Sequence, residues 1–133
     1  MGPARKKIAV WGLTFKPDTD DIRSSVAIDL VADMLREGAQ VSVYDPKGME
    51  RAREIPEIKS ARFCENALAA ADGAEALVIA TEWAEFANVD LGVVKEKMTT
   101  PIVFDGRNLF DPSTMAKMGF RYHSVGRTPV TPD

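Results

Sequence analysis

Three short, continuous apolar runs constrain the fold of this chain more than any other feature. They are residues 7–12 (KIAVWG), 76–80 (ALVIA) and 102–105 (IVFD). Short apolar runs that contain β-branched residues and end at glycine or a polar residue are typical of buried strands. Because the runs do not alternate between apolar and polar residues, we expect helices to cover both faces of these strands.

Helical and strand-like segments alternate along the rest of the chain. Apolar residues recur at helical spacing from Val26 to Leu35, and Gly38 is expected to end that helix. Further helices are predicted at 47–53, 66–72, 89–98 and 112–118, and further strands at 40–44, 62–64 and 120–124. This alternation predicts an α/β fold with a doubly wound, mainly parallel, Rossmann-like sheet in three αβα layers.

The length of the chain fits one domain. It has 133 residues, of which 45% are hydrophobic and 28% are charged, and a chain of this size buries a sufficient core without disulfides or metals. We expect residues 1–6 to be a tail, residues 7–127 to form the domain and residues 128–133 to be a flexible tail.

Charge and hydropathy exclude several classes of protein. The net charge is −3 with both signs mixed along the chain, which argues against a nucleic-acid partner. No apolar run approaches the roughly 18 residues that span a membrane, and the first residues lack the apolar stretch of a signal peptide. The single cysteine, Cys64, excludes an internal disulfide, so we expect a cytoplasmic protein.

The loop after the first strand carries the most informative group of residues. Ligands of doubly wound sheets bind beyond the carboxyl ends of the strands, but Gly12 is not followed by the remaining glycines of a dinucleotide fingerprint. The loop instead contains Phe15, which suits a base or sugar, Lys16, which suits a phosphate, and Arg23, which suits two phosphate oxygens. The alternative is a solvated loop in which these cations pair with the loop's own aspartates.

Three other loops follow strands at the same expected edge. Asp45 stands where a Rossmann domain holds ribose hydroxyls, or else is a turn aspartate before proline. Arg107 adds a second cation to a candidate anion site. Thr81 is a candidate cap for a short helix, and Trp83 and Phe86 either form a pocket wall or pack against the sheet.

The sequence contains no recognisable catalytic or metal-binding arrangement. Cys64 has no neighbouring base that would activate it, so we expect a structural thiol. His123 is the only histidine, which leaves a zinc site or a serine–histidine–aspartate triad without support. We therefore expect no catalytic residue and no metal.

Five motifs resemble the C-terminal, UDP-binding domain of the UDP-glucose/GDP-mannose dehydrogenase family. They are residues 12–25 (GLTFKPDTDDIRSS), 38–41 (GAQV) together with 44–46 (YDP), 76–83 (ALVIATEW), 104–108 (FDGRN) and 119–122 (GFRY). The resemblance covers about residues 6–127 and implies a Rossmann-like domain that binds a UDP-sugar. Family members oxidise the C6 hydroxyl of a nucleotide sugar to a carboxylate in two NAD-dependent steps, with UDP-glucose and its product UDP-glucuronate as the default pair.

The same resemblance implies roles for four residues. Phe15, Lys16 and Arg107 would contact the UDP-sugar, and Arg23 would reach NAD bound by an N-terminal domain. A central helical dimerisation domain would complete the enzyme. The catalytic cysteine of the family belongs to those other parts and Cys64 does not match it, so we expect this chain alone to be inactive.

Two alternative functions remain open at this point. One is a free-standing, non-catalytic nucleotide-binding or regulatory α/β module. The other is a dinucleotide-binding domain with an altered fingerprint, for which Asp45 is the motive.

Overall fold

The computed structural model describes residues 6–14, 16–23 and 25–132. These residues form one six-stranded sheet in which every strand pairing is parallel. The strands are β1 (Lys7–Trp11), β2 (Gln40–Tyr44), β3 (Arg62–Phe63), β4 (Ala76–Ile79), β5 (Ile102–Asp105) and β6 (Arg121–Ser124). Each strand lies within a segment that the sequence predicts as a strand.

Short helices connect the strands, and they also lie close to the predicted segments. They are α1 (Val26–Arg36), α2 (Met49–Arg53), α3 (Ala67–Ala71), α4 (Ala84–Ala87), α5 (Leu91–Lys97) and α6 (Pro112–Lys117). The structure adds a 3₁₀ turn, η1 (Pro56–Ile58), which the sequence analysis does not predict. The expected end of the first helix is confirmed, because the Gly38 amide donates to the Leu35 carbonyl and Gly38 has a φ of 91°.

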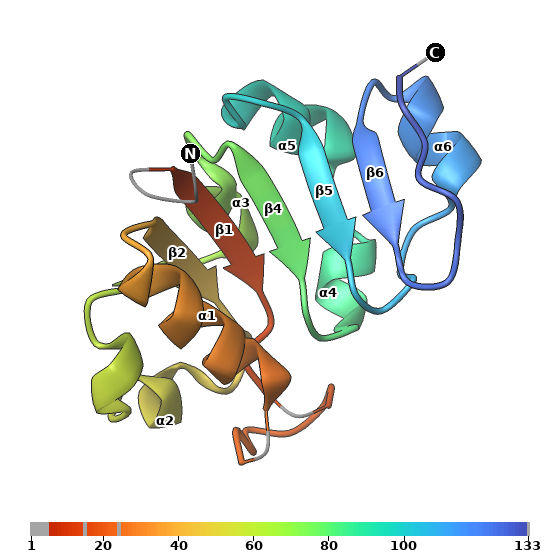
Figure 1. The fold of residues 1–133 in the computed structure, drawn as a ribbon. Coiled ribbons are helices and arrows are strands. Elements are labelled where there is room, and N and C mark those ends of the chain that lie inside the picture. Colours follow the sequence, from red (N-terminus) through yellow and green to blue (C-terminus); the bar gives the residue numbers. More distant parts are fainter. Residues whose placement is uncertain (1–5, 15, 24, 133) are drawn as a thin grey trace.

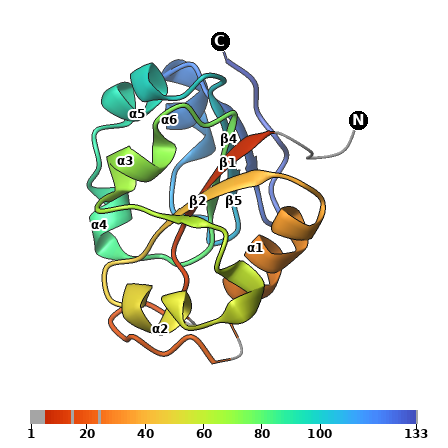
Figure 2. The same ribbon diagram turned by 90° about the vertical axis from the view of Figure 1, so that its left-hand side faces the viewer.

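The strand order is β3-β2-β1-β4-β5-β6, so the direction of winding reverses between β1 and β4. Right-handed crossovers then put the helices of the two halves on opposite faces of the sheet. Figure 2 shows the sheet between α1 on one side and α3, α4 and α5 on the other. The predicted doubly wound, three-layer α/β fold is confirmed.

Each face of the sheet has its own apolar core. On the α1 side the largest buried members include Leu13, Val31, Val43 and Ile58. On the other side the larger members are Trp11, Leu77, Ile79, Phe86, Met115, Phe120 and Tyr122. Strand β1 supplies alternate residues to the two cores, which explains why its sequence is continuously apolar.

The expectation that both faces of residues 102–105 are covered is wrong. Phe104 of β5 has 44% of its surface exposed and stacks on His123 of β6, with ring centroids 4.8 Å apart. The reason is the winding, because α5 and α6 belong to the same half of the sheet and pack on its other face (Figure 1). Among the described residues, α1 and α2 contribute only to the core over the β1–β3 half.

The segment after β6 differs from the predicted flexible tail at one position. Val130 forms an antiparallel bridge with Tyr122, with N–O distances of 2.9 and 3.0 Å. Strand β6 is at the edge of the sheet, so its outer backbone groups are free to pair with a returning segment. None of the helices in the described part of the chain is long and apolar enough to cross a membrane.

Candidate functional site

The loops that follow β1, β2, β4 and β5 leave the sheet at the same edge (Figure 1). The reversal of strand order lies between β1 and β4, which is where doubly wound sheets bind their ligands. The sequence-predicted residues Lys16, Arg23 and Arg107 all lie on these loops. Phe15 lies outside the described residues, so its predicted role stays a prediction.

Gly12 allows the β1 and β4 loops to approach each other closely. It has a φ of 100°, and a Cβ atom on it would lie 2.6 Å from the Cβ and Oγ1 atoms of Thr81. Its amide donates to the Tyr44 carbonyl at 2.8 Å. Gly12 is therefore required because the β1 loop packs closely against Thr81 of the β4 loop. The first glycine of a dinucleotide fingerprint has a different task, because it makes the tight turn at the pyrophosphate.

Asp45 is a buried acceptor that ties three segments of the chain together. Its Oδ2 atom accepts from the amides of Leu13 and Thr14, at 2.8 and 3.1 Å, from the Thr14 hydroxyl at 3.1 Å and from the Trp83 indole at 3.2 Å. Its Oδ1 atom accepts from the amides of Lys47 and Gly48 at 2.9 and 2.7 Å. A carboxylate has about four lone-pair sites, so no acceptor capacity is left for a ribose. The turn interpretation of Asp45 is supported.

The residues that follow β4 connect the β4 loop to the β1 loop. The Thr81 hydroxyl donates to the Thr14 carbonyl at 2.9 Å, and the Trp83 indole lies 3.2 Å from the Thr14 hydroxyl. Thr81 does not cap α4, whose N-cap residue is Trp83. Phe86 is fully buried against Trp11, with ring centroids 5.3 Å apart. Packing is therefore the correct interpretation for both aromatic residues, although Trp83 also donates hydrogen bonds.

A second buried carboxylate, Asp105, shapes the loop that carries Arg107. It accepts from the amides of Arg107, Leu109 and Phe110 at 2.9, 2.7 and 3.1 Å. The Tyr122 hydroxyl lies 2.6 Å from its Oδ2 atom, and burial, followed by this hydrogen bond, raises the pKa of Tyr122. The Asp-Gly-Arg turn is thus held from inside the protein.

The Arg107 side chain points to the same edge as the β4 loop. Its Nη2 atom lies 3.3 Å from Oε1 of Glu82, and 36% of the Arg107 side chain is exposed. Glu82 stands between Thr81 and Trp83, which contact Thr14. The three-residue segment 81–83 therefore contacts both the loop that carries Lys16 and the loop that carries Arg107.

Lys16 is exposed, and it follows closely in the sequence the part of its loop that is hydrogen-bonded to Asp45. In the described ranges it forms no ion pair. The residues immediately before it in the described part, Leu13 and Thr14, are buried and hydrogen-bonded to Asp45. Lys16 thus presents an exposed ammonium group two residues after a hydrogen-bonded stretch of its loop, and such a group suits an anionic ligand.

Two other cations near this loop, Arg23 and Arg51, pair with its aspartates. Arg23 contacts Asp21 with both side-chain bonds at 3.0 Å, and Arg51 of α2 donates to Asp20 at 2.8 Å. The Arg23 hydrogen bond lowers the pKa of Asp21 to about 2. The Arg23 side chain is 88% exposed. The solvated-loop interpretation therefore describes Arg23 and Arg51, and it does not describe Lys16.

The sequence analysis places Thr81 at this edge as a candidate cap, but it does not predict the contacts that Thr14, Thr81, Glu82 and Asp105 make there. A weak signal was present, because Thr14 and Thr81 are polar residues in otherwise apolar stretches directly after strands. The two threonines are bonded to each other and lie 67 residues apart in the sequence, and no local pattern predicts such a pairing.

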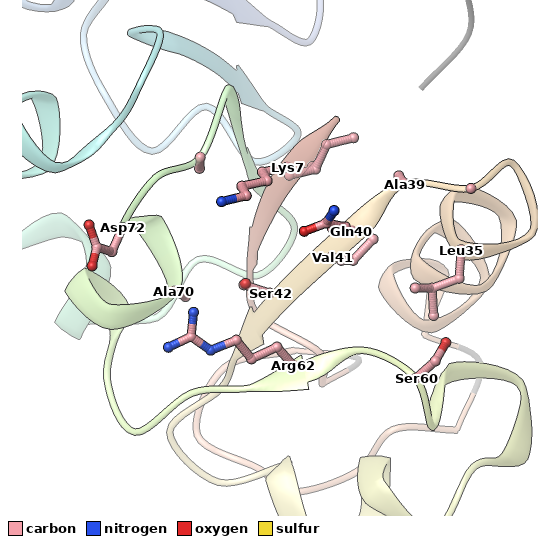
Figure 3. Close-up of a pocket in the computed structure, with 13 residues that line it drawn as sticks. Lys7, Leu35, Ala39, Gln40, Val41, Ser42, Ser60, Arg62, Ala70 and Asp72 are labelled. Atoms are coloured by element: carbon pink, nitrogen blue, oxygen red, sulfur yellow. The ribbon is translucent and has the colours of Figure 1, made fainter. Parts of the chain in front are cut away.

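A surface depression of about 450 Å³ lies at the opposite edge, near the amino ends of β1, β2 and β3. Figure 3 shows Lys7, Gln40, Ser42 and Arg62 turned toward a shared space, with Asp72 across from them. Two depressions of about 480 and 460 Å³ lie beside the β1 loop, and aspartates with Lys47, Arg23 or Arg51 line them. We favour the carboxyl edge as the ligand site, because ligands of this fold bind there and the sequence motifs gather there.

Catalytic groups were not expected, and the geometry of Cys64 agrees with a structural thiol. Cys64 is buried, and burial raises the pKa of its thiol, whereas a nucleophilic cysteine requires a lowered pKa. Among the described residues, no group of three or more histidine, cysteine, aspartate or glutamate side chains is arranged to hold a metal ion.

Comparisons with known proteins agree with the motifs at this edge. Residues 9–112 match the model of the UDP-glucose/GDP-mannose dehydrogenase family, UDP binding domain. A UDP-glucose 6-dehydrogenase of Rhizobium meliloti is 49% identical over 121 residues, which cover 91% of this chain and 27% of the relative. A UDP-glucose 6-dehydrogenase of Pseudomonas aeruginosa is 40% identical over 126 residues, with 92% and 28% covered.

Solved structures give the same result. A UDP-glucose dehydrogenase from Pyrobaculum islandicum superposes with a TM-score of 0.77 at 32% identity, covering 96% of this chain and 27% of that one. A UDP-D-ManNAc dehydrogenase from Pyrococcus horikoshii has a TM-score of 0.75 at 30% identity, with 94% and 26% covered. The chain spans 27–28% of the length of the curated relatives that it matches. It belongs to the UDP-glucose/GDP-mannose dehydrogenase family and corresponds to that family's UDP-binding domain.

Proposed function

We propose that this chain supplies the UDP-sugar-binding half of the active site of an NAD-dependent UDP-glucose 6-dehydrogenase. Such an enzyme oxidises UDP-glucose to UDP-glucuronate. The names of the most similar relatives support UDP-glucose as the substrate. A solved relative that is named for UDP-D-ManNAc has the same fold at lower identity, so the fold itself does not select the sugar.

Lys16, Arg107 and Phe15 are the residues proposed to contact the UDP-sugar. The observation that carries this proposal is the 81–83 segment, which connects the loops of Lys16 and Arg107 through Thr81, Glu82 and Trp83. An ammonium group and a guanidinium group on connected loops suit the two phosphates of UDP. Phe15 would pack on the base or the sugar.

Arg23 is proposed to contact NAD that is bound mainly by an N-terminal domain outside this chain. When NAD is bound, it serves as the hydride acceptor of the reaction. This chain does not fit a complete dinucleotide site, because Gly12 packs on Thr81 and the oxygens of Asp45 are occupied by protein donors. Arg23 extends from the surface with 88% of its side chain exposed, which is compatible with a contact across a domain interface.

Two further partners are part of the same proposal. They are the N-terminal NAD-binding domain and a central dimerisation domain, which between them would bring the catalytic cysteine. The alternative, a free-standing non-catalytic nucleotide-binding module, shares the UDP site and differs only in those partners. Oxidation of UDP-glucose by a longer protein that contains this sequence would separate the two proposals.

Isothermal titration of the chain with UDP tests the binding site. We expect weak binding, because part of the pocket would come from elsewhere, and loss of most of the binding heat in the double variant Lys16→Ala/Arg107→Ala. The matched control is Lys7→Ala/Arg62→Ala, which removes the same two kinds of charge at the opposite edge (Figure 3). Equal heats for wild type and the Lys16/Arg107 variant would contradict the assignment.

Activity measurements test the division of labour. With UDP-glucose and NAD present, we expect the isolated chain to produce no NADH, because Cys64 is buried with a raised pKa. Formation of NADH at a rate proportional to the concentration of the chain would contradict the proposal that catalysis belongs to another domain.

A further inference from the structure

We propose that Trp83 is a positioning residue for the loop that carries Lys16, and that it acts through Asp45 and Thr14. The inference rests on the proposed function, in which Lys16 contacts the phosphates of the ligand. It adds a residue to which neither the family match nor the comparisons assign a role.

The first observation is that the Lys16 loop is fixed by a shared acceptor rather than by regular secondary structure. Leu13 and Thr14 follow the end of β1, and both donate their amides to Oδ2 of Asp45. The Thr14 hydroxyl lies 3.1 Å from the same oxygen. The Asp45 carboxylate therefore holds the backbone of Leu13 and Thr14, and Thr14 lies two residues before Lys16 in the sequence.

The second observation is that the Trp83 indole holds this acceptor from the other side of the switch point. Its Nε1 atom lies 3.2 Å from both Asp45 Oδ2 and Thr14 Oγ1, and its ring is buried. Hydrogen bonds to ionised acceptors are stronger than those between neutral groups. Without the indole, Oδ2 of Asp45 keeps donors only from Leu13 and Thr14 and loses its bond to the segment after β4. Removal of the indole N–H is therefore expected to loosen the Leu13–Thr14 backbone.

The third observation is that the same short segment reaches the second ligand loop. Thr81 donates to the Thr14 carbonyl, and Glu82 pairs with Arg107. Trp83 and Thr81 thus fix one ligand loop while the residue between them contacts the other. A binding site tolerates errors of only about 0.5 Å in the placement of its groups, so a small shift of the 81–83 segment should weaken the hold on the ligand.

A pair of tryptophan variants separates this role from general stability. Trp83→Phe keeps an aromatic ring and removes the indole N–H beside Asp45. Trp11→Phe makes the same chemical change elsewhere, because the buried Trp11 donates its indole N–H to the Ala67 carbonyl at 2.9 Å. Thr81→Val, which replaces the hydroxyl bonded to Thr14 with a methyl group of similar size, serves as a second test if Trp83→Phe fails to fold.

The Kd for UDP and the melting temperature are measured for each variant. We expect the Kd to rise about five- to tenfold in Trp83→Phe, which corresponds to the loss of about one hydrogen bond. We expect less than a twofold change in Trp11→Phe, even though its melting temperature falls by a similar amount. Thr81→Val should change the Kd in the same direction as Trp83→Phe. Equal Kd values for Trp83→Phe and Trp11→Phe would overturn the inference. If Trp83→Phe does not fold, an unchanged Kd in Thr81→Val would overturn it.

If the wild-type chain binds no UDP, the proposed function is contradicted, but the positioning role of Trp83 is still open to a test by hydrogen exchange. The amides of Leu13 and Thr14 should then exchange faster in Trp83→Phe than in wild type, and at the wild-type rate in Trp11→Phe. Unchanged protection of these two amides in Trp83→Phe would overturn the positioning role independently of any ligand.

Discussion

The Tyr122 hydroxyl lies 2.6 Å from the Asp105 carboxylate, which links β6 to the end of β5 beneath the loop that carries Arg107. Tyr122→Phe removes this hydroxyl, which also lies 3.1 Å from Nη2 of Arg127. We expect a loss of about 1–2 kcal/mol in the free energy of unfolding, because Asp105 retains its backbone donors. Urea denaturation measures the loss. Wild-type stability in this variant would show that the bond contributes nothing.

Gly12→Ala tests the close approach of the β1 and β4 loops. The added Cβ would lie 2.6 Å from Thr81 at a φ of 100°, so we expect a destabilisation of roughly 3 kcal/mol or more, or failure to fold. Gly126→Ala is the control, because Gly126 also has a positive φ of 71° but nothing lies within 4 Å of its added Cβ. That change should cost about 1–2 kcal/mol. Equal thermal stability of the two variants would contradict a steric role for Gly12.

Cys64 should be a slowly reacting thiol in the folded chain. Its burial raises the pKa of the thiol above the ordinary value, so the thiolate fraction at neutral pH is smaller than that of a free cysteine. Alkylation by iodoacetamide, followed by mass spectrometry, should be slow when the chain is folded and should reach the free-cysteine rate in urea. Rapid alkylation of the folded chain at pH 7 would contradict the structural assignment.

The Asp21–Arg23 pair gives a pH dependence with a defined sign. The Arg23 hydrogen bond lowers the pKa of Asp21 to about 2 in the folded chain. A carboxylate whose pKa is lower in the folded state adds stability that is present above its unfolded pKa and is lost as the pH falls toward the folded value. The contribution of this pair should therefore disappear between about pH 4 and pH 2.

Carboxyl carbon NMR of Asp21 checks the value directly. The pKa should rise toward its ordinary value in Arg23→Ala, and the melting temperature at pH 7 should hardly change, because the Arg23 side chain is 88% exposed. Arg23→Lys keeps a positive charge and should give an intermediate pKa. An Asp21 pKa that is the same in wild type and Arg23→Ala would contradict the pairing.

Local patterns in the sequence predicted the fold well, because each pattern reflects a nearby physical cause. The apolar runs lie in β1, β4 and β5, and the glycine at position 38 ends α1. The apolar run 102–105 was misleading at Phe104, because an apolar sequence does not show which face of the strand a helix will cover. That coverage depends on the reversal of winding between β1 and β4.

The candidate site was only partly predictable. Lys16 and Arg107 could be assigned to one edge from their places after strands, since parallel strands end together. The turn at Asp45 was one of two predicted alternatives, but its role as a shared acceptor could not be predicted, because its partners Leu13, Thr14 and Trp83 are 32, 31 and 38 residues away. The hydrogen bonds that turn an aspartate into a structural acceptor depend on tertiary contacts, which propensity and spacing do not encode.

The most direct test of the central claim is a map of amide chemical-shift changes during titration of the ¹⁵N-labelled chain with UDP. If the carboxyl edge binds the nucleotide, the largest changes will fall in residues 12–16, 81–83 and 105–109, and Lys16→Ala/Arg107→Ala will remove them. Changes that instead cluster around Lys7, Gln40 and Arg62 at the opposite edge, or that persist in the double variant, would contradict the assignment of this edge as the UDP site.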